Sequence, residues 1–356
     1  MNMTKYFSLS LILLLGFSLQ VYAQHSFEHI APEEAGFDPN KLDSLAMYLE
    51  DAGSSSMMIL VDGKIAFEWG ETDRPHTIHS IRKAMLNSLY GIKVNEGVID
   101  TNKTMADLGI DDIFELSEQE KTARIADLLK SRSGVYHSSA ATSQGMLRGK
   151  PERDSYKPGE YYFYNNWDFN VLGAILEQET GKSIYELYYE EIAKPLGMHD
   201  FKGRYDTITI DEDFEEEGFP TRDGFYQYEP DKSKYPAYHF RMSARDMALY
   251  GQLYLQNGNW EGEQLIPESW IQTSVKPYSP YNPRFGLAYG MLWYVLMPTE
   301  TRSSTSFYHT GTGVHMMGIY PASKLVLIHR VDTEKENDFG SSEFYGMIDR
   351  VWGARD

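Results

Sequence analysis

A serine and a lysine three residues apart, Ser80 and Lys83, are the first pair whose types and spacing could do chemistry. On a helix, side chains three positions apart lie on one face and within contact distance. A serine hydroxyl is a weak nucleophile until a base takes its proton, and a partly buried lysine amine can be that base. Taken alone, the pair is weak evidence for a catalytic site, because a chain of this composition contains about one Ser-x-x-Lys by chance.

Two further groups follow in chain order. Tyr164 and Asn166 directly precede an expected helix that begins near Trp167. His309 and Gly311 fall at an expected edge of a C-terminal sheet, just before a strand. Their order and context make a chance occurrence of the serine and lysine pair less credible.

These three motifs, in this order, resemble those of class C β-lactamases and their relatives, which include esterases, D-amino-acid-releasing peptidases and amide-oligomer hydrolases. The resemblance covers about residues 30–353, essentially the whole chain after its first segment. The further segments that match the family pattern are Leu128-Leu129 with Ser133-Gly134, Pro158-Gly159-Glu160, Leu172-Gly173, Pro195–Met198, Met242–Met247, Trp260–Gly262, Ile266-Pro267 and Tyr289–Trp293.

The resemblance implies that Ser80 attacks a substrate carbonyl and forms an acyl-enzyme. Lys83 is then the base, or it lowers the pKa of Tyr164 so that the phenolate shares that duty. Tyr164 protonates the leaving group and later activates the water. Asn166 orients Lys83 and the substrate by hydrogen bonds.

The resemblance also implies an oxyanion hole formed by the backbone N–H groups of Ser80 and Thr312, next to Gly311, where a side chain would block the substrate. His309 replaces the lysine of true β-lactamases and is mostly uncharged at neutral pH, so it holds a carboxylate less strongly. We therefore expect an esterase, D-peptidase or amide hydrolase. Three alternatives stay open: a penicillin-binding or β-lactamase-type protein with slow turnover, a non-catalytic scaffold, and a purely structural His309.

Other residues are weaker candidates for a role in the active site. His76 and His79 lie close to Ser80, but no Gly-x-Ser-x-Gly turn is present, so we interpret them as ordinary polar residues. His315 is expected to pack at the rim of a cleft. The aromatic cluster Tyr161–Trp167 lines either a pocket or the core, and the core is the more frequent outcome.

Periodicity predicts the elements that position these residues. Apolar residues at helical spacing predict helices at 40–51, 81–97, 123–129, 167–180, 184–192, 243–257 and 342–352. Short apolar runs predict strands at 57–61, 65–69, 287–296, 307–309, 314–320 and 325–332. The tyrosine-rich, acidic stretch 201–240 lacks a clear period, so we expect a long surface excursion, of which 205–236 either covers the cleft or is a solvated loop.

Strands at both ends of the chain with helices between them predict an α+β fold of the β-lactamase/transpeptidase type. One antiparallel sheet is expected from the two termini, flanked by helices, with a mostly helical region inserted. We place the sheet subdomain at about 24–79 and 285–356 and the helical region at about 80–284, within one domain over 24–356.

Residues 1–23 have the layout of a cleavable signal peptide, since their apolar run is shorter than the roughly 20 residues that span a bilayer. A membrane anchor is the less favoured reading, and we expect a periplasmic or extracellular protein. The chain has no cysteine and a net charge of −19, which disfavours disulfides, cysteine metal sites and binding to nucleic acid. The expected partner is a small ester, amide or peptide, with no cofactor, no metal and no membrane insertion after cleavage.

Overall fold

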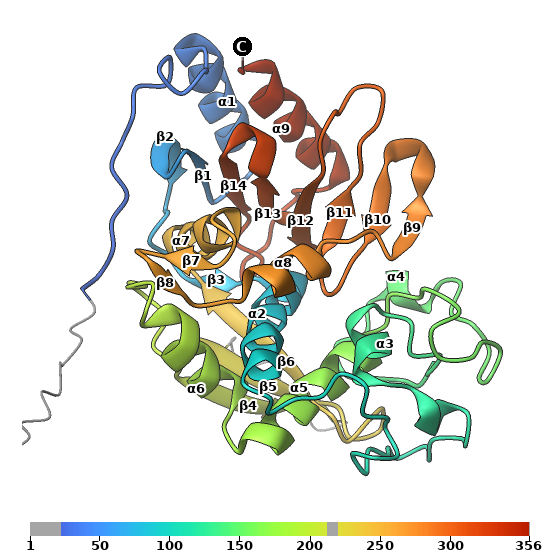
Figure 1. Ribbon diagram of the computed structural model, residues 1–356. Helices are drawn as coiled ribbons and strands as arrows, with labels where there is room; N and C mark the ends of the chain where they lie inside the picture. The colour runs from blue at the N-terminus through green and yellow to red at the C-terminus, as the bar shows by residue number, and fades with distance from the viewer. Residues whose placement is uncertain (1–22, 212–219, 356) are drawn as a thin grey trace, which may run out of the picture.

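Eight antiparallel strands form the central sheet of the computed structural model, which describes residues 23–211 and 220–355 (Figure 1). Their spatial order is β2-β1-β14-β13-β12-β11-β10-β9. The bounds are β1 (Ser56–Val61), β2 (Lys64–Gly70), β9 (Ser279–Asn282), β10 (Leu287–Tyr289), β11 (Tyr294–Leu296), β12 (Ser306–Gly311), β13 (His315–Tyr320) and β14 (Leu325–Arg330). Since β1 pairs with β14, strands from the two ends of the chain share one sheet, as predicted.

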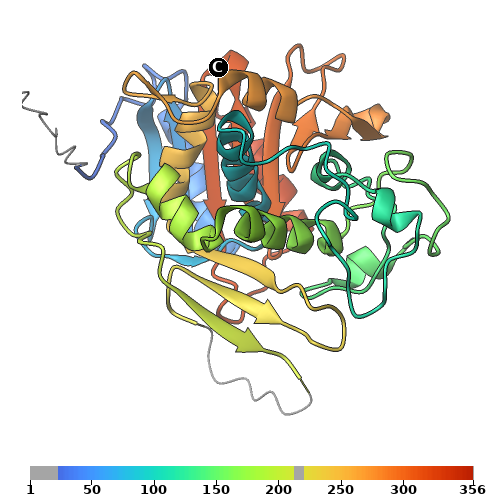
Figure 2. The ribbon, with the colours of Figure 1, turned by 60° about the horizontal axis from the view of Figure 1, so that its bottom comes forward.

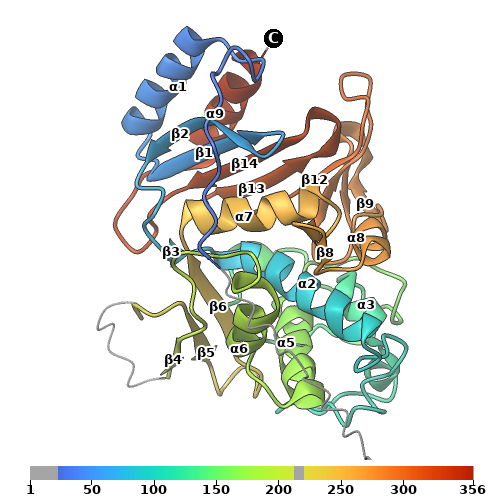
Figure 3. The ribbon, with the colours of Figure 1, turned by 60° about the vertical axis from the view of Figure 1, so that its left-hand side comes forward.

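Helices cover both faces of this sheet. α1 (Pro39–Asp51) and α9 (Ser341–Gly353) lie on one face, which we call the outer face, and α2 (Arg82–Asn95) and α7 (Ala244–Leu255) lie on the other, the inner face (Figure 3). Leu45 of α1 and Met347 of α9 are fully buried against the sheet residues Ile59 and Leu327. α7 packs directly on β1, β13 and β14, and α2, the helix that carries Lys83, lies beyond α7 on the same side of the sheet (Figure 3).

Capping residues define where the main helices begin and end. Asp38 and Ser243 are the N-caps of α1 and α7 and accept hydrogen bonds from backbone N–H groups of the first turn. α5 (Asn166–Thr180) ends at Gly181, whose φ of 70° is the left-handed conformation that glycine adopts without strain. The predicted helices 40–51, 167–180, 243–257 and 342–352 are therefore present within one to two residues.

The inserted region adds shorter elements. Two predicted helices are shorter than expected. α3 (Ile125–Leu129) begins later than predicted, and α6 (Ile184–Tyr188) ends early and is continued by a π-helical turn, η3 (Tyr189–Ala193). The other short helices and strands of this region are α4 (Gln144–Leu147), α8 (Glu268–Ser274), β7 (Asn259–Trp260) and β8 (Glu263–Gln264).

The stretch 201–240 is not a structureless surface excursion, and that prediction was wrong. It contributes β4 (Tyr205–Thr209), β5 (Gly224–Tyr228) and β6 (Ala237–Met242), which join β3 (His76–Thr77) in a second sheet in the order β3-β6-β5-β4 (Figure 2). Every residue of β6 is buried, so its sequence shows no alternation of polar and apolar residues.

The predicted strand 287–296 is also wrong in one respect. Its two halves are the antiparallel strands β10 and β11, joined by a tight turn in which Gly290 N–H donates to Trp293 O at 2.8 Å. Leu292 has a φ of 60° in that turn. The turn residues are buried and apolar, which hid the reversal from a reading of hydrophobicity alone.

The expected signal peptide, 1–23, lies outside the described residues except for Ala23. Over the ranges that the structure covers, each helix is too short or too polar to span a bilayer.

Candidate active site

Ser80 lies where the chain leaves β3 and enters α2, in the 3-10 turn η1 (His79–Ile81). His79, directly before the serine, has a φ of 48°, a left-handed conformation that is uncommon for a residue with a side chain. Its imidazole Nε2 forms a 2.8 Å hydrogen bond with Thr333 Oγ1, which ties this turn to the end of the central sheet. The turn presents Ser80 to a cleft on the surface.

Lys83 follows one helical turn after Ser80, and its Nζ donates to Ser80 Oγ at 2.8 Å. The side chain is fully buried between the rings of Phe169 and Tyr164, whose centroids lie 4.5 and 4.7 Å from Nζ. Burial, and next the charge of Arg82, hold the pKa of Lys83 well below the usual lysine value. This shift favours the uncharged form of the amine, which is the form that can accept a proton from the serine.

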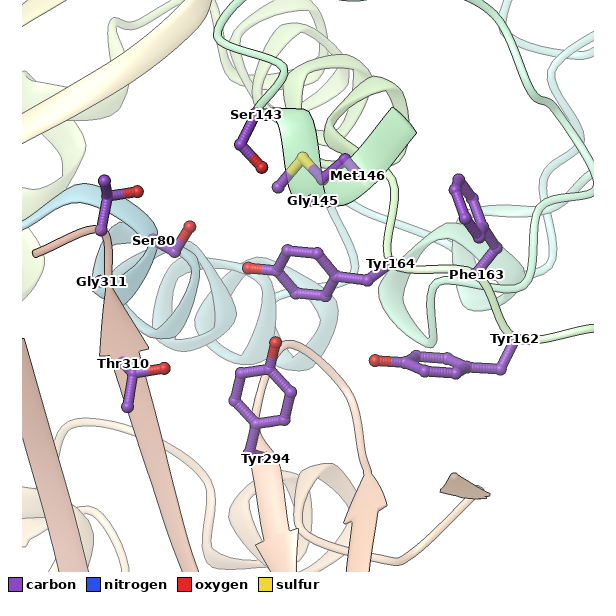
Figure 4. Close-up of a pocket in the computed structure, with 11 residues that line it drawn as sticks. Ser80, Ser143, Gly145, Met146, Tyr162, Phe163, Tyr164, Tyr294, Thr310 and Gly311 are labelled. Atoms are coloured by element: carbon purple, nitrogen blue, oxygen red, sulfur yellow. The ribbon is translucent and has the colours of Figure 1, made fainter. Parts of the chain in front are cut away.

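Tyr164 approaches the same hydroxyl from the segment before α5. Its phenol lies beside Ser80 in the cleft, and its ring packs against Phe169 at 4.9 Å (Figure 4). Burial raises the pKa of Tyr164 to about 12, although the neighbouring Ser80 hydroxyl, the charge of Arg82 and the Tyr294 hydroxyl act in the opposite direction. The group is therefore a protonated phenol at neutral pH, not the phenolate that the second of our two expectations required.

Asn166 occupies a different place from the one expected. Its Nδ2 donates to Ala141 O at 2.6 Å, and its Oδ1 is buried without a hydrogen-bond partner. No hydrogen bond joins Asn166 to Lys83 in the part of the chain that the structure describes. Asn166 thus packs near the site but does not orient the lysine here.

His309, on β12, lies inside the protein beneath the cleft. Its Nδ1 donates to Thr310 O at 2.9 Å, and its ring packs edge-on against Tyr294 at 5.2 Å. Burial first, and the charge of Lys83 next, lower the pKa of His309 to about 3. The imidazole is therefore neutral at neutral pH, as expected from its type, and it carries no fixed charge.

Gly311 ends β12 against the segment that leads to Ser80. A Cβ at this position would lie 2.5 Å from Ile78 O and 3.1 Å from His79 Cβ, so no larger residue fits. This close approach brings the next residue, Thr312, to the same cleft as Ser80.

The cleft itself has a volume of about 450 Å³ and lies between the edge of the sheet and the helical region (Figure 4). Residues of five separate segments form its walls. The lining residues are Ser80, Ser143, Gly145, Met146, Tyr162, Phe163, Tyr164, Tyr294, Thr310, Gly311 and Thr312. Of the predicted site residues, Ser80, Tyr164, Gly311 and Thr312 line the cleft, and Lys83, Asn166 and His309 are buried behind it.

Two residues near Ser80 were not anticipated. Tyr294 on β11 stacks on the ring of Tyr164 at 5.8 Å and lowers the pKa of that phenol. Arg82 is buried, donates to Asn170 Oδ1 at 3.2 Å and lowers the pKa of Lys83 by its charge. Both residues adjoin recognised segments, since Tyr294 follows the matched run that ends at Trp293 and Arg82 lies inside the Ser-x-x-Lys motif, but nothing in their types marked them.

The histidines near Ser80 do not form a triad with it. His76 is buried and pairs with Arg330, whose Nη2 lies 2.7 Å from His76 Nδ1. His315 is fully buried beside Arg330 and does not line the cleft, so its expected position at the rim was wrong. The reason is that β13, which His315 begins, is covered on both faces.

The aromatic cluster divides between the two expected environments. Tyr162 and Phe163 line the cleft, whereas Trp167 is fully buried in the core. None of the described residues within 205–236 lines the cleft. The outer wall of the cleft is instead formed by Ser143 and Met146, at the start of α4.

Comparison with solved structures shows the fold class. The chain superimposes on a protein described as a 6-aminohexanoate-dimer hydrolase from Bacillus anthracis with a TM-score of 0.64 and 19% identity, over 92% of this chain and 87% of that one. It matches a family VIII carboxylesterase with a TM-score of 0.60 and 16% identity, over 88% of this chain and 97% of that one. The architecture is therefore that of the β-lactamase/transpeptidase fold.

The family model described as Beta-lactamase matches residues 49–349. The chain belongs to the β-lactamase family, as its ordered motifs predicted. A provisionally named D-alanyl-D-alanine carboxypeptidase of Salmonella paratyphi A is 27% identical over 239 residues, which is 54% of each chain. One of the same name from Escherichia coli O157:H7 is 25% identical over 211 residues, 47% of this chain and 48% of that one. The chain thus spans about half the length of the curated relatives it matches.

Proposed function

We propose that this protein is a serine hydrolase that cleaves an ester or amide bond through an acyl-enzyme on Ser80. The observation that carries the proposal is the convergence on one hydroxyl: Lys83 Nζ lies 2.8 Å from Ser80 Oγ, and the Tyr164 phenol lies beside the same group in the cleft. The hydroxyl opens onto a cleft of about 450 Å³, which has room for a small acyl substrate.

Lys83 is the base in this proposal. Its low pKa leaves a lone pair on Nζ, which accepts the Ser80 proton as Oγ forms a bond to the substrate carbonyl carbon. A tyrosine with a pKa of about 12 keeps its own proton, so Tyr164 donates to the leaving group while Lys83 returns a proton to the phenol. The bond from the carbonyl carbon to the leaving group then breaks, and the acyl group stays on Ser80.

The negative oxygen of the intermediate needs donors at the sheet edge. The backbone N–H groups of Ser80 and Thr312 are the donors in this proposal, which is supported by the position of both residues in the cleft lining and by the tight contact between Gly311 and Ile78. Such a pair of backbone donors contributes about 3 kcal/mol of transition-state stabilisation per donor. A water molecule then attacks the acyl-enzyme, with the same lysine and tyrosine moving its protons in reverse.

Intact-mass spectrometry with a fluorophosphonate, simple esters, D-alanyl peptides and β-lactams tests the proposal. We expect one adduct per chain in the unmodified protein and none in Ser80→Ala. Ser143→Ala is a matched control, because it removes another hydroxyl from the same cleft and should leave labelling intact. Labelling that survives in Ser80→Ala contradicts the proposal, and a β-lactam adduct without turnover would favour a penicillin-binding protein instead.

We further propose that the protein is exported and cleaved after Ala23. The leader pattern of residues 1–23 supports this, and so do the contacts that begin just after it: His25 N–H donates to Gly197 O at 3.1 Å, and His199 Nε2 donates to His25 O at 2.7 Å. Mass analysis of the secreted protein should show a chain that starts at Gln24. A full-length chain retained in the cell contradicts this part of the proposal.

A further inference from the structure

The cleft walls carry no positive charge. Among the eleven described residues that line the cleft there is no lysine, arginine or histidine. The walls consist of tyrosine and phenylalanine rings, a methionine, hydroxyl groups and glycine backbone (Figure 4). A substrate carboxylate placed here would lose water without gaining a cationic partner, which is unfavourable.

Two cationic side chains lie close to Ser80, but both are withdrawn from the cleft. Lys83 is fully buried and its Nζ is bonded to Ser80. Arg82 is 2% exposed, donates to Asn170 and has its guanidinium 4.8 Å from the centre of the Tyr238 ring. Because both side chains are buried and bonded within the protein, neither offers an N–H group to a carboxylate on the substrate.

His309 has a hydrogen-bond acceptor and no positive charge at the position where a lysine would carry a charge. Because Thr310 O can only accept, the 2.9 Å hydrogen bond requires the proton to be on His309 Nδ1, and Nε2 is left as a lone pair. That Nε2 is buried and has no hydrogen-bond partner among the described residues. The position that holds a fixed charge in lysine-containing relatives thus holds a neutral, inward-facing ring.

Aromatic side chains in the cleft favour apolar groups on the substrate. Tyr162 packs against Tyr289 at 5.3 Å and stacks on Tyr281 at 5.8 Å, so its ring is held rigidly at the cleft wall. Burial raises the pKa of Tyr162 well above the usual tyrosine value, so this wall stays uncharged. Phe163 and Met146 also line the cleft. Rings and a thioether favour flat or apolar groups on the substrate.

We propose that the cleft selects uncharged acyl substrates with an aromatic or apolar group, and discriminates against substrates that carry a carboxylate near the scissile bond. The inference rests on the proposed serine hydrolase activity and deepens it. It separates this chain from the substrate in the name of its carboxypeptidase relatives, since a D-alanyl-D-alanine terminus ends in a carboxylate.

A pair of esters that differ in one carboxylate tests this directly. Phenyl acetate and 3-acetoxybenzoate have leaving groups of similar acidity, so a difference in kcat/KM reports the charge. We expect phenyl acetate to be favoured by about tenfold or more, a factor equal to about 1.4 kcal/mol. The measurement is made at about 0.5 M salt, where the Debye length is below about 10 Å, so that the net charge of −19 does not produce the effect at long range.

A charge placed on the cleft wall should weaken the preference. Met146→Lys adds a cation to the wall, and Met146→Gln is the matched neutral change of similar length. We expect Met146→Lys to lower the ratio of the two kcat/KM values by about threefold or more, the size of a solvent-exposed ion pair. Met146→Gln should leave the ratio near that of the unmodified protein.

The outcomes separate the two proposals. If the carboxylate ester is cleaved equally well or better, or if Met146→Gln changes the ratio as much as Met146→Lys, the selectivity inference is overturned and the hydrolase assignment stands. If neither ester shows turnover that depends on Ser80, the hydrolase assignment itself is overturned, and the selectivity inference with it.

Discussion

The two faces of the central sheet are buried by different kinds of residue. On the outer face, Leu45 and Leu49 of α1 and Met347 and Val351 of α9 pack on apolar sheet residues. On the inner face, apolar residues of α2 and α7 form a larger cluster with the sheet, and the buried set also includes Lys83 and Arg82 beside Ser80. Burying apolar groups stabilises a fold, whereas burying ionisable groups is unfavourable unless they are well paired. The comparison teaches that apolar packing stabilises both faces, and that the inner face in addition buries the ionisable groups of the site at a cost in stability.

The largest expected effect comes from replacing the buried amine. Lys83→Met keeps a chain of similar shape, so we expect hydrolysis to fall by about 10³- to 10⁴-fold while thermal stability is equal or higher. Steady-state kinetics with phenyl acetate and thermal unfolding measure both. Lys64→Met is the control, because Lys64 lies at the exposed surface in an ion pair with Glu28. A strongly destabilised but active Lys83→Met would break the contrast between the faces.

The outer face should show the reverse pattern. Leu45→Ala removes a fully buried side chain, so we expect the free energy of unfolding to fall by about 2–5 kcal/mol with kcat unchanged in the folded protein. Urea denaturation measures the loss. Met47→Ala, on the same helix but 63% exposed, should change stability by less than about 0.5 kcal/mol. A large fall in kcat for Leu45→Ala would contradict the separation of roles.

Adding one methyl group should reduce activity at the sheet edge but have little effect in an outer helix. Gly311→Ala places a Cβ 2.5 Å from Ile78 O, which displaces the strand from Ser80, so we expect kcat/KM to fall by about 10²-fold. Gly353→Ala in α9 meets no atom within 4 Å and should leave both activity and Tm nearly unchanged. Full activity of Gly311→Ala would show that the close approach is not needed.

The smallest expected effect is a pH dependence. His309 has a pKa of about 3 when folded and about 6.5 when unfolded, so the unfolded chain binds more protons between these values. Its contribution to stability is therefore present above pH 6.5 and is lost as the pH falls toward 3, by up to about 1.4 kcal/mol per pH unit. Urea denaturation at several pH values should show a shallower acid loss in His309→Asn than in the unmodified protein.

Catalytic activity should have a different pH profile from stability. The lowered pKa of Lys83 favours its active, uncharged amine at a pH well below the usual pKa of lysine, and activity should fall as the amine becomes protonated in acid. The alkaline limit should be set by Tyr164, whose pKa is about 12, or by unfolding. A rate that rises only near the usual pKa of lysine, about 10.4, would contradict the role of Lys83 as base.

Residues that act within one element were the most predictable part of the site. Ser80 and Lys83 are three positions apart at the start of a helix, so local geometry alone brings them together. Gly311 and Thr312 were named from the resemblance to the family's third motif, and both line the cleft. Asn166 shows the limit of motif reasoning, since the residue is present but its amide points to Ala141.

The sequence by itself determined the family, the helices with clear caps, and the pair of terminal regions that build one sheet, because periodicity and capping are local properties of the chain. Only the tertiary structure decided the pairing of β4–β6, the turn at Gly290, and the positions of Tyr294 and Arg82. It also decided how far the pKa values of Lys83 and His309 are lowered, since these values depend on burial by segments far away in the sequence.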